Sequence, residues 1–209
     1  MIVACRSIGR QISLLDQVDR DFIIRCLCAF SGGLVARLRN RDERAAIKHW
    51  LDEDNLTNCD DCNEVLNQIG LRCLALMQQG TITPIHYSVI EGQLTSLSRV
   101  QAGCERIVKT PVPFAYSLLL HRTALIFCLT LPFSLAGSLD WWTFLPVLLV
   151  AYTFFGLDAL GHELEDPFSL EPNGLPLGAI QRTIERELLS LLGKNELPEH
   201  IEPHDSVLL

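Results

Sequence analysis

The chain contains two apolar spans that lie back to back, and these spans restrict its fold more than any other feature. They are Thr123–Leu139 and Trp141–Leu157, each 17 residues long and free of Asp, Glu, Lys and Arg, with only Asp140 between them. As a helix, each span would cover about 25 Å, and flanking apolar residues would complete the roughly 30 Å of a hydrocarbon core. The alternative is a buried hairpin of a soluble protein, but the two spans have almost no polar face. The sequence therefore predicts a transmembrane helical hairpin with a turn at Gly137–Asp140.

The residues outside this hairpin show the helical spacing of apolar side chains and no strand pattern of weight. Residues 3–39 predict one long helix or two abutting helices, and the pair Gly32-Gly33 is a candidate for a bend. Thr83 and Pro84 are residue types that suit an N-cap and a first helical position, so they predict the start of a helix. Helices are expected over Ala45–Leu51, Asn63–Gln79, Pro84–Val108 and Leu177–Leu192.

These patterns predict an all-α membrane protein, with a cytoplasmic helical layer plus a transmembrane helical hairpin in a lipid bilayer. We expect a cytoplasmic helical region over residues 1–113 and the hairpin over 114–162. An acidic turn and a cytoplasmic return helix would follow over 163–193, and a flexible tail over 194–209.

Composition argues against several functions. The formal net charge is −8, so the chain lacks the basic surface that nucleic-acid binding needs. Of the eight cysteines only Cys59 and Cys62 have the spacing of zinc ligands, and no second Cys or His pair follows them. We therefore expect no metal site, no cofactor and no nucleic-acid partner, and we expect reduced thiols in a cytoplasmic compartment.

Charged residues near the cytoplasmic ends of the two spans are candidates for a structural pair. Arg122 lies near the start of the first span and Asp158 at the end of the second. Charges at membrane depth are costly, so pairing would satisfy both groups, and we favour this over an ion-binding site. The neighbouring sequence His162-Glu163-Leu164-Glu165-Asp166 resembles a zinc-protease motif, but Asp166 replaces the second histidine, so no enzyme is predicted.

Three stretches together resemble the bestrophin family, in particular its bacterial members. They are Cys104–Tyr116, leading into Leu120-His121-Arg122-Thr123, then Gly161–Phe168, and then Asn173–Leu177. Their order and spacing match, and the likeness covers most of residues 3–192. The resemblance implies an ion channel that conducts inorganic ions passively through the central pore of a homopentamer. The family includes chloride channels, but the ion selectivity of this chain stays open.

The resemblance also implies particular site residues. A cytosolic pore constriction in the family is formed by an apolar residue that follows a proline, and Thr83-Pro84-Ile85 places Ile85 at that position. Glu163, Asp166 and Glu171 match positions of an acidic turn that binds calcium in animal members. Calcium is not carried over, because Pro172, Asn173 and Gly174 replace most of the acidic run that follows.

Family chains begin with a first membrane hairpin that carries an apolar pore neck, and Met1–Ser7 of this chain resembles the cytosolic continuation of that hairpin. The neck is therefore expected to be missing from this sequence. The alternative function is a truncated, non-conducting membrane interaction or regulatory protein, and conductance in bilayers separates it from a channel.

The distribution of basic residues predicts the orientation of the hairpin. Lys and Arg lie on both flanks of the hairpin and are absent from the Gly137–Asp140 turn. By the positive-inside rule, both termini are cytoplasmic and the turn is outside the cytoplasm, in a multi-pass protein of the inner (plasma) membrane.

This orientation predicts that Ser138→Cys reacts with an impermeant thiol reagent added to intact cells, while Lys194→Cys does not. The unsubstituted chain, with its eight cysteines, is the control for background labelling. Labelling of Lys194→Cys alone would show the opposite orientation.

Overall fold

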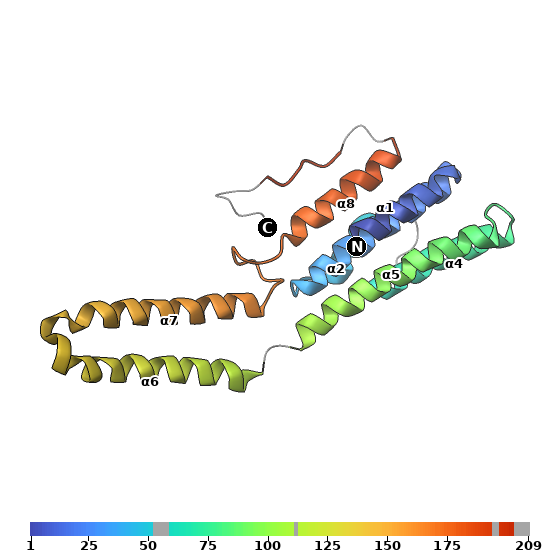
Figure 1. The fold of residues 1–209 in the computed structure, drawn as a ribbon. Coiled ribbons are helices and arrows are strands. Elements are labelled where there is room, and N and C mark those ends of the chain that lie inside the picture. Colours follow the sequence, from blue (N-terminus) through green and yellow to red (C-terminus); the bar gives the residue numbers. More distant parts are fainter. Residues whose placement is uncertain (52–58, 111–112, 194–196, 203–209) are drawn as a thin grey trace. The chain divides into compact units, whose positions relative to one another are not determined.

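The computed structural model describes residues 1–51, 59–110, 113–193 and 197–202, and within these the regular structure is helical with no strand (Figure 1). The chain forms two compact units. The first comprises Met1–Val108 and Leu175–Leu209, and the second comprises Lys109–Gly174. The all-helical prediction is confirmed for the described residues.

The first unit contains most of the helices. They are α1 (Ile2–Gln11), the short 3-10 helix η1 (Ile12–Leu14), α2 (Gln17–Leu38), α3 (Glu43–Leu51), α4 (Cys62–Gln78), α5 (Pro84–Lys109, whose last residue belongs to the second unit) and α8 (Leu177–Leu191). The second unit contains α6 (Phe114–Leu139), the 3-10 helix η3 (Asp140–Thr143) and α7 (Phe144–Glu165). The polar connector 52–58 lies outside the described residues.

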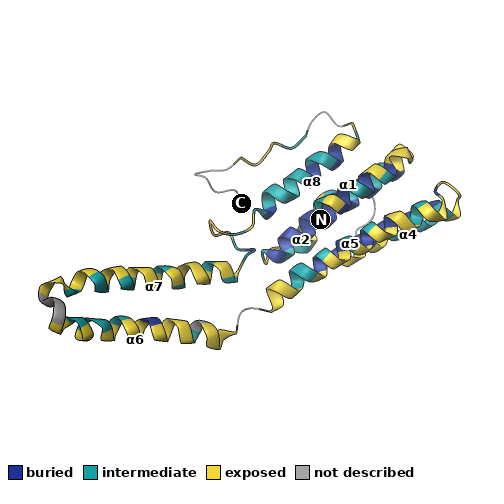
Figure 2. Ribbon diagram, in the orientation of Figure 1, coloured by how far each residue is buried: buried dark blue, intermediate teal, exposed yellow. Residues whose placement is uncertain are grey.

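Helix α2 forms the centre of the first unit. It packs against α3, α4 and α8, and its second half is buried on nearly every side (Figure 2). Its largest buried side chains, Leu27, Phe30 and Leu34, are almost completely inaccessible. A helix that is buried all round needs apolar or small residues on all faces, and the run Cys26–Ala36 meets this need.

The break within residues 3–39 lies at Leu15 and Asp16, where the backbone is extended between η1 and α2. It does not lie at Gly32-Gly33, as the glycine pair had suggested, because α2 runs through both residues without interruption. The pair allows close packing instead. A Cβ atom on Gly33 would lie 2.8 Å from Cγ1 of Ile47 and 3.0 Å from Sγ of Cys62.

Long-range ion pairs join helices of this unit, and two of them involve the N-terminal helices α1 and α2 with α8 and α4. Arg72 of α4 donates from Nε to Asp19 of α2 at 2.6 Å, and its guanidinium lies 5.9 Å from the centre of the Phe22 ring. Arg6 of α1 donates from Nε to Glu187 of α8, also at 2.6 Å. These contacts fix α4 and α8 to the two N-terminal helices.

Local signals set the predicted helix ends. Thr83 caps α5, because its Oγ1 accepts from the backbone N–H of His86 at 3.2 Å, and Pro84 is the first helical residue. Asp61 caps α4 in the same way, accepting from the N–H of Glu64 at 2.8 Å. Gly80, just beyond α4, has a φ of +78°, which favours glycine.

The second unit is the predicted hairpin. Two segments, Phe114–Gly137 and Trp141–Glu165, are long and apolar enough to cross a membrane, and almost none of their residues is buried. The core helices of a soluble protein would be mostly buried, so this exposed apolar surface fits a lipid environment. Helix α6 continues to Leu139 and η3 makes the connection, so the turn lies a few residues later than Gly137–Asp140.

The packing at Gly33 predicts that Gly33→Ala lowers the free energy of unfolding by about 1–3 kcal/mol through overpacking. The matched control is Gly92→Ala in α5, where a Cβ would meet nothing within 4 Å. Gly92→Ala should raise the free energy of unfolding by about 0.5–1 kcal/mol, because it reduces the backbone entropy of the unfolded chain. Denaturant unfolding of the purified chain in mild detergent measures both, and equal effects would contradict the role of Gly33.

Candidate functional site

The N-terminus of α5 presents an exposed apolar side chain. Ile85 is the second residue of the helix and is 79% exposed within this chain. It is therefore not a core residue of the isolated subunit. The first N–H groups of a helix lack partners within the helix and carry a partial positive charge, so Ile85 lies beside an electropositive helix end.

A long-range hydrogen bond holds this first turn of α5 in place. Nε2 of His86 lies 2.9 Å from the carbonyl oxygen of Gln11, the last residue of α1. The two residues are 75 positions apart in the chain. Sequence reasoning missed His86, because nothing in the local pattern indicates a partner at the end of another helix.

The three carboxylates expected in the acidic turn have different surroundings. The Glu163 carboxylate accepts from the side-chain amide of Asn173, and Oδ1 of Asp166 accepts from the N–H of Phe168 at 3.3 Å. The backbone carbonyl of Glu171 accepts from the N–H of Gly174 at 2.8 Å. Two of the three carboxylates thus stabilise the turn itself, and no three metal-ligating residues cluster anywhere in the described part of the chain.

Asp158 has a partner on the facing helix of the hairpin. Its Oδ2 lies 2.8 Å from Nδ1 of His121, and the His121 ring also packs edge-on against Phe155, with 6.3 Å between centroids. Sequence reasoning had named Arg122, the next residue along, because it carries a permanent charge. The pair between Arg122 and Asp158 stays a prediction, and the contact that the structure shows at Asp158 is with His121.

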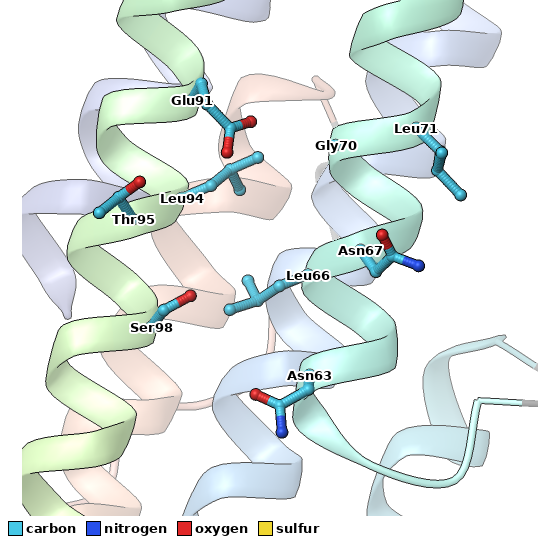
Figure 3. A pocket seen from close by; sticks show the side chains of 9 residues that line it. All are labelled: Asn63, Leu66, Asn67, Gly70, Leu71, Glu91, Leu94, Thr95 and Ser98. Atoms are coloured by element: carbon cyan, nitrogen blue, oxygen red, sulfur yellow. The ribbon is translucent and has the colours of Figure 1, made fainter.

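A groove of about 280 Å³ separates α4 from α5 in the first unit (Figure 3). Leu66 and Leu94 project into the space between the helices, and Glu91 lies above them. Polar side chains line the rest of the groove: Asn63, Asn67, Thr95 and Ser98. Glu91 is the only charged residue among those that line the groove. The groove therefore offers no pair of charged or nucleophilic side chains that would indicate a catalytic site.

Four cysteines of the first unit, Cys5, Cys59, Cys62 and Cys73, are buried thiols of low reactivity. Burial raises the pKa of Cys5 and of Cys73 to about 11, so both are protonated at neutral pH. Burial and the neighbouring carboxylates also raise the pKa of Cys59 and of Cys62, the pair with metal-like spacing. Metals bind the thiolate form, so these surroundings disfavour a zinc site at the pair.

Fold and site together define a helical membrane protein with a helical layer, an exposed transmembrane hairpin and an apolar side chain at an electropositive helix end. The sequence profile of the bacterial and fungal bestrophin proteins matches residues 1–190. The chain therefore belongs to the bestrophin family, as the three sequence stretches indicated.

Curated relatives carry channel names. The voltage-dependent anion channel-forming protein YneE of Salmonella typhi is 37% identical over 204 residues, which cover 95% of this chain and 67% of the relative. The protein of the same name from Escherichia coli K12 is 38% identical, over 97% of this chain and 69% of the relative. The chain thus spans about two thirds of the length of these relatives, which are channel-forming proteins rather than enzymes.

A solved structure has the same fold. The crystal structure of a bacterial bestrophin homologue from Klebsiella pneumoniae is 37% identical and superposes with a TM-score of 0.86. The match covers 93% of this chain and 75% of that one. The predicted fold class, a bestrophin-like all-α membrane protein, is confirmed.

The contact inside the hairpin predicts energetic coupling between His121 and Asp158. In a double-mutant cycle of alanine substitutions we expect a coupling free energy of about 0.6–1.7 kcal/mol, typical of hydrogen bonds between membrane helices. A second cycle between Arg122 and Asp158 is the matched comparison, since Arg122 is the residue of α6 that directly follows His121. Reversible unfolding in mixed micelles measures both. Coupling only in the Arg122 cycle would favour the pair expected from sequence.

Proposed function

We propose that this chain is a subunit of a bestrophin-type ion channel that passes inorganic ions passively through the central pore of a homopentamer. The single observation that carries the proposal is Ile85, a large apolar side chain left 79% exposed at the start of α5 in a protein whose relatives are named anion channel-forming proteins. An isoleucine left exposed at a capped helix end suits a position that faces a pore, and four more copies of the chain around an axis would complete a ring of such side chains.

Five Ile85 side chains around the axis would form an apolar ring. Such a ring offers a permeating ion no polar partner beyond its own water, so it filters ions by their hydration and size. The N-termini of five α5 helices would point their partial positive charges at the same axis, which favours anions over cations. The hydrogen bond from His86 to Gln11 supports this arrangement by fixing the first turn of α5.

The hairpin of α6 and α7 anchors the subunit in the inner (plasma) membrane. Its exposed apolar side chains, among them Leu129, Phe133 and Leu148, need lipid or neighbouring helices around them. Both termini are cytoplasmic in this proposal, and the acidic turn with Glu163, Asp166 and Glu171 is a candidate ion site at the cytoplasmic end of α7.

A second function is a non-conducting membrane interaction or regulatory protein. Recording from the purified chain in planar bilayers separates the two: ion currents support the channel, and a reconstituted, oligomeric but silent chain supports the interaction protein.

The proposed ring predicts that Ile85→Ala alters the relative permeability of small and large anions, because it widens the constriction. The thermal stability of the oligomer should stay nearly unchanged, since the side chain is not part of the subunit core. Leu71→Ala in α4 is the control, because Leu71 is an exposed apolar side chain that does not lie at the N-terminus of a helix. Bilayer recordings with chloride and larger anions give the permeability ratios.

The opposite pattern would contradict the assignment of Ile85. A core residue would lose about 2–5 kcal/mol of stability on truncation to alanine. Lower stability with unaltered permeability ratios would therefore place Ile85 in a packed interface away from the pore.

A further inference from the structure

Arg39, the C-cap of α2, has hydrogen-bond donors that nothing else in the described structure satisfies. Its Nε and Nη2 atoms are covered by protein atoms, and neither has a hydrogen-bond partner among the described residues. Native proteins pair nearly all of their buried polar groups, so two unpaired donors on one side chain call for a ligand.

The two donors have the geometry of a binding fork. Nε and Nη2 lie on the same edge of the planar guanidinium group, so their N–H bonds run parallel. This edge matches two oxygens bound to one central atom, as in a phosphate, and such bidentate pairs are among the stronger hydrogen-bonding arrangements in proteins.

Two carbonyl groups in the last turn of α2 already accept hydrogen bonds from the backbone. The N–H of Arg41 donates to the carbonyl of Ala36 at 2.7 Å, and the N–H of Asn40 donates to that of Arg37 at 3.1 Å. Asn40 adopts a φ of +51°, the left-handed conformation that completes this helix-ending motif. The backbone therefore satisfies its own carbonyls and leaves the Arg39 side chain without them.

The neighbouring charges leave positive charge uncompensated at Arg39. Arg37, two residues earlier, lies 3.2 Å from the carboxylate of Glu105 and 3.7 Å from that of Glu43, so these two carboxylates are engaged elsewhere. Burial and the nearby Arg41 guanidinium lower the pKa of Arg39 from its usual value. An anion bound between the two arginines would reverse this repulsion.

We propose that Arg39, assisted by Arg41, binds an oxyanion of the phosphate class through its Nε and Nη2 edge. Arg39 is half-buried as a residue, so an anion does not have to enter the core of the unit to reach it. Inorganic phosphate and the phosphate of a lipid headgroup share this chemistry. The site lies within the first unit and does not depend on the channel function proposed above.

The test measures phosphate binding to the full chain in a phosphate-free maltoside detergent. Isothermal titration with inorganic phosphate is compared with sodium chloride at equal ionic strength. Flotation with vesicles of phosphatidylcholine, with and without phosphatidic acid, then tests the lipid source. Saturable binding of inorganic phosphate indicates a soluble ligand, and retention only by phosphatidic acid vesicles indicates a lipid headgroup. Either result supports the site if it depends on Arg39.

Three variants test whether anion binding depends on the Arg39 side chain. Arg39→Gln should weaken binding at least tenfold, and Arg39→Lys should weaken it severalfold, because a lysine keeps the charge but loses the fork. Arg44→Gln is the matched control: it removes the same charge from a side chain that is already paired with Asp60 at 2.7 Å, and it should bind as the unsubstituted chain does.

Other outcomes overturn the proposal. Equal losses in Arg39→Gln and Arg44→Gln would show a general effect of net charge, and full binding by Arg39→Lys would exclude the fork. No binding of phosphate or phosphatidic acid above the chloride and phosphatidylcholine controls would exclude the site. If Arg39→Gln instead changed the oligomer size alone, the partner would be a carboxylate of a second copy. Should Arg39→Gln not fold, Arg39→Lys decides the question, because it retains the charge.

Discussion

The close packing of other helices around α2 is the constraint on which the first unit depends. A helix that is buried on nearly every side needs other helices packed closely against its backbone. Gly33 permits this close packing, because it has no side chain where Ile47 and Cys62 contact α2. Because α3, α4 and α8 all pack on α2, its position determines theirs. The long-range pairs from Asp19 and Glu187 then reinforce an arrangement that apolar burial has already established.

The two units differ in whether their apolar side chains are buried or exposed. The first buries its isoleucines and leucines inside a helical layer, as a protein in water must. The second exposes them along both helices of the hairpin, which is stable only where lipid or other helices replace water. The solved bestrophin homologue from Klebsiella pneumoniae has the same fold over most of this chain.

Buried polar groups in the described part of the chain are mostly paired, and the Arg39 side chain is the exception on which the proposed anion site rests. The Arg37 side chain has two carboxylate partners, whereas Arg39, two residues later, has two donors without any. Ile85 is one of several large apolar side chains of the first unit that are exposed, and it lies at the N-terminus of a helix. The two unpaired donors of Arg39 and the exposed side chain of Ile85 are the observations on which the proposed anion site and the proposed pore position rest.

The sequence by itself determined the features that depend on neighbouring residues. The lack of charge over two spans identified the hairpin, Thr83-Pro84 identified the start of α5, and three short stretches identified the family. The tertiary structure decided the rest. Only packing shows that Gly32-Gly33 admits a neighbouring helix rather than a bend, that Asp158 meets His121, and that His86 bonds to Gln11. These contacts join residues far apart in the chain. Which residues meet depends on how whole helices pack, and a local sequence pattern does not indicate that packing.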